Sequence, residues 1–179
     1  MSTLLAVVSH DRRRPVAREE LDALVAVAED LRGRGAVHHA AAGDWARVAC
    51  VGDPELDHRR EGDPGWLVAV GAVHAPAGSS RPSVPDLDGQ FAAARHDGAR
   101  DEVEVFNDPL GMQPLYRAEH EGRTYLATSS TVLARHLSAA PDPLGARLFL
   151  HTGNQFGPVT HWHGVERLDP ATILTFAPG

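Results

Sequence analysis

The fold is best predicted from residues 87–130, LDGQFAAARHDGARDEVEVFNDPLGMQPLYRAEHEGRTYLATSS. This stretch contains four short apolar runs, at residues 91–95, 103–107, 115–117 and 124–127. The turn-forming groups His-Asp-Gly, Pro-Leu-Gly and Glu-Gly separate these runs. Short apolar runs divided in this way are typical of antiparallel strands joined by tight turns. The pattern therefore predicts four adjacent strands that form one meander.

The segments before this stretch alternate between strand and helix patterns. Residues 3–9 form an apolar run, which predicts a buried strand almost at the start of the chain. Residues 15–35 carry apolar side chains at helical spacing, with Glu19 and Glu20 early, so one amphipathic helix is expected there. A hairpin, a central strand and an exposed loop rich in Pro and Ser are expected at residues 37–51, 66–74 and 75–85.

The segments after residue 130 are shorter. Residues 129–137 and 144–150 predict two short helices, which the prolines between them separate. Residues 160–165 and 172–176 predict two more strands. Strands in two groups with flanking helices indicate a layered α+β domain.

Length and composition indicate one soluble domain. The 179 residues suffice for one hydrophobic core and are too few for two large domains. No apolar run approaches the roughly 18 residues of a membrane span, and the first residues lack the order of a secretory signal. A cytoplasmic location is therefore expected. The net charge of −7 disfavours nucleic-acid binding, which needs a surplus of Lys and Arg on one face.

The order of motifs in residues 87–130 resembles the N-terminal glutamine amidotransferase domain of the asparagine synthetase family. The shared order is an LDG-x-F-A opening, a D-x-LG-x-x-PLY turn and strand, and a strand that ends in A-T-S-S. The later segment THWHGVERLDP resembles the family's Thr-x-aromatic-x-Gly segment. Relatives include β-lactam synthetases and lasso peptide cyclases. The resemblance implies one Ntn-hydrolase-type domain over residues 1–179, a four-layer αββα sandwich of two antiparallel sheets between helices.

The resemblance also implies where catalysis would occur. An Ntn amidotransferase uses its first residue as nucleophile and the free α-amine of that residue as base. The matching residue is Ser2, where the family has Cys, and removal of the initiator Met would expose its amine. The family's oxyanion-binding Asn-Gly pair corresponds to Val70 and Gly71. Losing one oxyanion donor typically costs on the order of 100- to 1,000-fold in rate, so a vestigial pocket is expected.

Of two family residues that bind glutamine, one has no counterpart in this sequence and the other has one. The Asp that clamps the glutamine α-amine has no counterpart between residues 74 and 87, which hold only the Pro- and Ser-rich segment. Arg47 resembles the family's Arg that binds the α-carboxylate. A single Arg on a strand also serves commonly as a structural ion-pair partner, so both roles stay open.

Other reactive residues do not form a recognisable centre. Cys50 lies inside an apolar run, which favours a small buried hydrophobe over a nucleophile. His161 and His163 share one strand face in the predicted pattern and His38 and His39 are adjacent, but no further ligand stands at a zinc spacing. No metal is expected.

These features predict a degenerate, non-catalytic amidotransferase-like domain that serves a structural or partner role. The partner would be an ATP-dependent synthetase of the β-lactam synthetase or lasso peptide cyclase type in natural-product biosynthesis. The SGG-x-DS loop of such a synthetase is absent from the sequence, so ATP and magnesium are expected only on a partner. The chain is expected to be half of a split enzyme or a shortened piece, with Phe149, Phe156 and Trp162 as candidate anchors. A Ser2-dependent amidohydrolase and a regulatory module that binds an amino acid through Arg47 remain alternatives.

Overall fold

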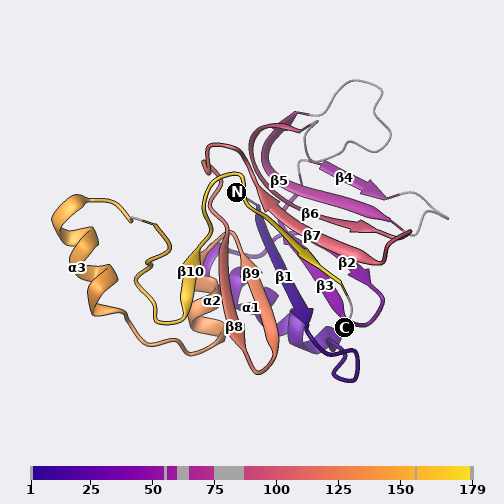
Figure 1. The fold of residues 1–179 in the computed structure, drawn as a ribbon, viewed down its shortest axis with the longest axis horizontal. Coiled ribbons are helices and arrows are strands. Elements are labelled where there is room, and N and C mark those ends of the chain that lie inside the picture. Colours follow the sequence, from indigo (N-terminus) through magenta and orange to yellow (C-terminus); the bar gives the residue numbers. More distant parts are fainter. Residues whose placement is uncertain (1, 55, 60–64, 75–86, 156, 178–179) are drawn as a thin grey trace.

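The computed structural model describes residues 2–54, 56–59, 65–74, 87–155 and 157–177. Within these ranges the strands form two antiparallel sheets, and Figure 1 shows them stacked face to face. The elements in chain order are β1 (Thr3–Ser9), α1 (Arg18–Arg32), β2 (Val37–Ala42), β3 (Ala46–Val51), β4 (Leu56–Arg59), β5 (Trp66–His74), β6 (Asp88–Asp97), β7 (Glu102–Asn107), β8 (Tyr116–His120), β9 (Arg123–Ala127), α2 (Ser130–His136), α3 (Pro143–Thr152), β10 (Val165–Arg167) and β11 (Ile173–Phe176).

The first sheet has the strand order β10-β8-β9-β1-β3-β2, and the second has the order β11-β7-β6-β5-β4. The predicted bounds of β1 and β5 coincide with the observed ones, and β2 and β3 form the hairpin expected at residues 37–51. The expected strand at residues 160–165 is wrong, because pairing with β8 begins only at Val165. The expected loop at residues 75–85 lies outside the described residues.

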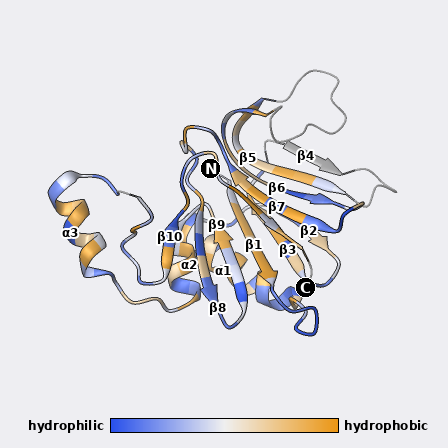
Figure 2. Cartoon of the chain, in the orientation of Figure 1, coloured by the Kyte–Doolittle hydropathy of each residue, from blue (hydrophilic) through white to orange (hydrophobic). Residues whose placement is uncertain are grey.

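Strand β1 is central because it is apolar on both faces. Leu4 and Ala6 point into the core between the two sheets, whereas Leu5 and Val7 point into a second core beneath the helices. All seven residues of β1 are buried. Figure 2 shows the same concentration of hydrophobic residues along β1 and β5. Burial on both faces explains why residues 3–9 form an uninterrupted apolar run.

Helices α1 and α2 cover the outer face of the first sheet. The buried face of α1 consists of Leu21, Leu24, Val25 and Ala28, at the predicted helical spacing. The four-layer expectation requires helices over the second sheet as well. Among the described residues, none of the three α-helices lies over that sheet, and α3 extends away from the body (Figure 1). None of the described helices is long and apolar enough to cross a membrane.

The predicted four-stranded meander is wrong in one respect. Strands β6 and β7 pair in the second sheet, whereas β8 and β9 pair in the first. The turn after β7 carries the chain from one sheet to the other, and the buried Asp108 fixes its path. Its carboxylate accepts hydrogen bonds from the backbone N–H groups of Leu110, Met112 and Gln113, at 3.0, 3.0 and 2.8 Å. Asp108 therefore redirects the chain before β8 begins.

Two tryptophans help to hold the sheets together at the end where the 98–101 turn lies. The indole of Trp45, beside β3, donates to Asp101 of that turn at 3.3 Å. The indole of Trp66, on β5, donates to the carbonyl of Ala41 on β2 at 2.8 Å. Each bond joins an element of one sheet to an element of the other. The opposite end of β1, where the chain starts, lies between the sheets (Figure 1).

Candidate functional site

Ser2 lies at the head of β1, as expected for an N-terminal nucleophile position. Its side chain is partly exposed, and its Oγ donates a hydrogen bond to the backbone carbonyl of Asp53 at 2.5 Å. Gly52 makes this approach possible, since it adopts a φ of +92° and a Cβ there would lie 3.1 Å from the Ser2 Oγ. Gly52 and Asp53, which directly follow β3, therefore lie beside Ser2 at the head of β1.

Thr128 fixes the other side of the head of β1. The backbone N–H of Leu4 donates to the Thr128 Oγ1 at 3.2 Å, and the Thr128 N–H donates to the Leu4 carbonyl at 3.1 Å. Thr128 is buried, so this pair of bonds holds the strand rigidly two residues after Ser2. No role for Thr128 is evident from the sequence alone. Its signal was the A-T-S-S ending, which it occupies directly after β9.

Val70 and Gly71, which the resemblance matches to the oxyanion-binding pair, lie in the middle of β5. The Val70 side chain is 0% exposed and packs in the core between the sheets, together with Leu4. Gly71 adopts a φ of +98°, and a Cβ at this position would overlap the backbone carbonyl oxygen of Gln90 on β6. The glycine is thus required by the close β5–β6 approach, whatever its part in chemistry.

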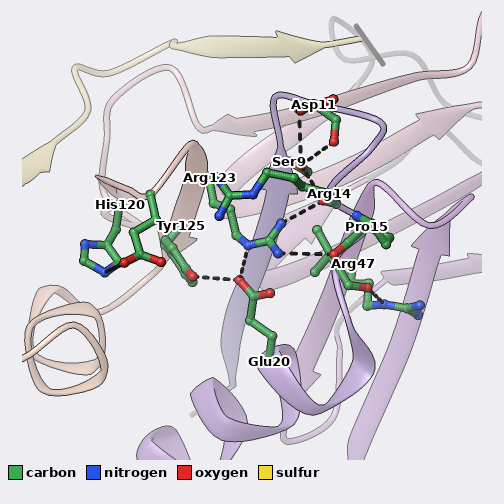
Figure 3. A network of polar contacts seen from close by, with 11 residues as sticks. Ser9, Asp11, Arg14, Pro15, Glu20, Arg47, His120, Arg123 and Tyr125 are labelled. Atoms are coloured by element: carbon green, nitrogen blue, oxygen red, sulfur yellow. Dashed lines mark hydrogen bonds and ion pairs between the residues drawn. The ribbon is translucent and has the colours of Figure 1, made fainter.

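Arg47 is not brought together with Ser2. In the β1–β3 pair, Thr3 faces Val51 and Val7 faces Arg47, so four residue steps, ~13 Å, separate Arg47 from the head of β1. Its Nε donates to the backbone carbonyl of Val16 at 2.5 Å. Figure 3 shows this contact, with the Arg47 side chain turned away from the neighbouring polar network. The geometry gives Arg47 a place near α1 and no contact with Ser2.

The network in Figure 3 connects α1, β9 and the loop after β1 at the same end of the sheet as Arg47. Glu20 forms an ion pair with Arg123 Nε at 2.8 Å and accepts a hydrogen bond from the Tyr125 hydroxyl at 2.7 Å. Arg123 also donates to the carbonyls of Arg14 and Pro15, at 3.1 and 3.2 Å. Burial and the adjacent Glu20 raise the pKa of Tyr125, which keeps its hydroxyl protonated as a donor. These bonds are internal to the protein and serve to anchor the loop.

The other reactive side chains have structural surroundings. Cys50 is buried in the core between the sheets, as a small hydrophobe would be. The His161 ring packs edge-on against Phe149, with 4.9 Å between ring centroids. His163 lies 3.6 Å from an oxygen of Asp142. Within the described ranges, no group of three or more His, Cys, Asp or Glu side chains is arranged to hold a metal.

Comparison with known proteins gives two findings. Residues 70–179, more than half of the chain, match the family model described as "Glutamine amidotransferase domain". Among solved structures, the chain is similar to the glutamine phosphoribosylpyrophosphate amidotransferase from B. subtilis complexed with ADP and GMP, at 12% sequence identity and a TM-score of 0.50. This alignment covers 75% of the present chain and 43% of the other, so the present chain spans less than half of that protein. No curated protein matches.

At this identity the structural likeness concerns the fold alone. It agrees with a sandwich of two antiparallel sheets of the kind found in Ntn-type amidotransferases. The family match names the amidotransferase domain and no narrower branch.

Proposed function

Because the chain belongs to the glutamine amidotransferase domain family, we propose that it is a degenerate, non-catalytic member of that family. It serves a structural or partner role for an ATP-dependent, asparagine synthetase-like enzyme that forms amides or lactams. We propose an enzyme of the β-lactam synthetase or lasso peptide cyclase type, since in these enzymes the substrate supplies the reacting amine and the reaction needs no ammonia from glutamine. ATP and magnesium belong to the partner in this proposal.

The observation that carries the proposal is the environment of Val70. An amidotransferase must stabilise the oxyanion of a tetrahedral intermediate with hydrogen-bond donors. A valine side chain has no donor, and Val70 is fully buried among the apolar residues between the sheets. An Asn introduced there without a partner would leave a buried amide unsatisfied, at a cost of about 1–3 kcal/mol. The core is therefore adapted to the valine.

The surroundings of Ser2 support the same proposal. A nucleophilic hydroxyl needs a base that accepts its proton during attack. The Ser2 hydroxyl donates to the backbone carbonyl of Asp53, which is not a general base at neutral pH, so a base would have to come from the α-amine that removal of Met1 frees. Arg47 lies at the far end of the β1–β3 pair and so is not available to bind a substrate held at Ser2.

Helix α3 supports the partner role. Its ten residues include Leu144, Phe149 and Leu150, whose exposed fractions are 56%, 43% and 82%. Exposed large apolar side chains on one short element are unusual on a protein surface, and they favour an interaction site there. Of the anchors expected from the sequence, Phe149 lies on this helix. Trp162 is partly buried against the helical core cluster, and Phe156 lies outside the described residues.

The test is release of ammonia from glutamine at millimolar substrate. We expect no turnover above background, and Ser2→Ala to behave as the parent. Turnover above about one per second, ordinary for an enzyme, would overturn the proposal if it disappeared in Ser2→Ala. Ser129→Ala is the matched control, because Ser129 follows Thr128 and its side chain makes no capping hydrogen bond to α2.

A Ser2-dependent amidohydrolase is the second candidate. The observation that favours it is the partly exposed Ser2 hydroxyl at the head of β1, which donates to the Asp53 carbonyl, in a strand that Thr128 holds through the backbone of Leu4. This candidate requires removal of Met1, which intact-mass measurement detects. It also requires hydrolysis of an amide other than glutamine, such as an N-acyl amino acid, that Ser2→Ala abolishes. A chain that retains Met1 could not use the Ser2 amine as base, and this candidate would then fail.

A further inference from the structure

A small hollow lies between the start of α1 and the β2–β3 hairpin, away from Ser2. Its volume is about 220 Å³, below the ~300–1,000 Å³ of sites for drug-sized ligands. Three of its lining residues are basic, Arg18, His39 and Arg47, and three are apolar, Leu21, Ala40 and Ala41. The side chain of Ala40 packs in the core between the sheets, so Leu21 and Ala41 form the apolar wall of the hollow. The hollow therefore combines a cationic rim with an apolar wall.

Arg47 is held in position within this hollow. The hydrogen bond from its Nε to the Val16 carbonyl fixes the plane of the guanidinium. Among the described residues, neither η nitrogen has a hydrogen-bond or ion-pair partner. A guanidinium fixed in this way offers two parallel N–H donors, an arrangement that matches the two oxygens of a carboxylate.

The charged groups around the hollow limit the net charge of a ligand that can bind there. An oxygen of Asp22 lies 3.6 Å from Arg18 Nε, and the other lies 3.9 Å from His39 Nε2. Two arginines and one aspartate leave a single positive charge in excess while His39 is neutral. This excess suits a monoanion better than a dianion such as phosphate, because Asp22 would repel the second negative charge.

We propose that this hollow binds a small organic monocarboxylate, with its carboxylate on the η nitrogens of Arg47 and its apolar part against Leu21 and Ala41. The site is separate from the Ser2 position, since Arg47 lies four residue steps along β1 from the strand head. Its existence does not depend on whether the domain is catalytic. It is a ligand site on the helix-covered face of the first sheet.

The experiment is a titration of the full chain with sodium butyrate, followed by two-dimensional ¹H–¹⁵N NMR. We expect saturable shifts at the Arg47 Nε–H and at the amides of Ala40 and Ala41. Binding should weaken by about tenfold or more in Arg47→Gln, because a charge-assisted pair is lost. Sodium phosphate and butylammonium chloride, at equal ionic strength, test the charge of the ligand.

Arg117→Gln is the matched control, since Arg117 lies on β8 of the same sheet and pairs with Glu166 instead. It should bind butyrate as the parent does, and circular dichroism checks that each variant is folded. Asp22→Asn adds a positive test, because removing its negative charge should strengthen phosphate binding at the same amides. The proposal is overturned if butyrate gives no saturable shift, if Arg47→Gln binds it unchanged, or if phosphate binds the parent more tightly than butyrate.

Discussion

Gly111 shows how one residue determines a turn without contacting any reacting group. It lies in the turn that Asp108 organises, and its N–H donates to the Asp108 carbonyl at 3.0 Å. Its φ is +63°, a conformation that a branched side chain tolerates poorly. A Cβ at this position would also lie 2.9 Å from the Cγ of Pro170. Backbone strain and steric conflict thus act together.

We predict that Gly111→Val lowers the free energy of unfolding by about 1–3 kcal/mol, the usual cost of such strain. Urea denaturation followed by circular dichroism measures it. Gly153→Ala is the control, because Gly153 has a φ of +72° but no atom within 4 Å of the added Cβ. The control should be less destabilised than Gly111→Val. A Gly111→Val variant that is as stable as the parent would contradict the assignment of the turn.

His136 connects a single residue to the pH dependence of stability. Its ring lies against Tyr125, with 5.4 Å between centroids. Burial lowers the pKa of His136 below its ordinary value of 6.5, an effect that Glu20 opposes and His120 reinforces. The folded protein therefore binds this proton less readily than the unfolded chain does. The stabilisation is complete above about pH 6.5 and is lost as the pH falls through the lowered pKa.

We predict that the free energy of unfolding decreases between pH 7 and about pH 5, and that His136→Gln makes this decrease smaller. Urea denaturation at several pH values measures the slope. The exposed His151, on α3, provides the control His151→Gln, which should retain the parent slope. An unchanged slope in a folded His136→Gln variant would show that other groups cause the decrease.

Among the elements, β1 was predictable because both of its faces are buried, which gives an uninterrupted apolar run. Strand β1 could be bounded from its apolar run, because the polar residues Ser2 and His10 flank it. The partner of a hairpin could not be predicted in the same way. The β6–β7 and β8–β9 pairs have similar patterns but lie in different sheets, and the buried Asp108 organises the turn between them through contacts that the pattern does not indicate.

The candidate site was predictable to the extent that it depends on chain position. Ser2 precedes a strand that the sequence identified, so its place at the strand head followed directly. The place of Arg47 depends on the register between β1 and β3, which one sequence does not determine. Thr128 acts through backbone bonds to Leu4, a contact over 124 positions that no local pattern indicates.

Helix α3 provides a test of how weakly one element is attached. Gly145 is its one buried residue, and a Cβ at this position would overlap the carbonyl oxygen of Thr160. We predict that Gly145→Ala displaces α3 and increases amide hydrogen exchange in residues 143–152. The two sheets should keep their protection against exchange. Mass spectrometry of exchanged peptides measures this. Arg147→Ala, an exposed change on the same helix, should leave exchange unchanged, and equal exchange in both variants would contradict the packing role of Gly145.

At the scale of the whole molecule, the partner role predicts a contact that includes α3. Contacts between domains of this kind bury roughly 600–1,500 Å², more than a ten-residue helix supplies alone, so neighbouring surface must take part. Leu150 is the cleanest position to test, because it is 82% exposed, whereas the Phe149 ring also packs on His161 within this chain. Removing Leu150 therefore affects a partner and leaves the internal packing intact.

We predict that the chain associates with the ATP-dependent synthetase encoded beside its gene, and that Leu150→Ser weakens this association by about tenfold, the equivalent of one well-buried apolar side chain. Isothermal titration calorimetry measures both affinities after circular dichroism has shown that the variant is folded. Leu110→Ser is the matched control, since Leu110 is 76% exposed and lies in the Asp108 turn. Failure of the parent chain to bind would remove the partner role for that pair. Unchanged binding of Leu150→Ser would leave the partner role standing and exclude α3 as its anchor, because a buried leucine cannot be replaced by serine without loss of affinity.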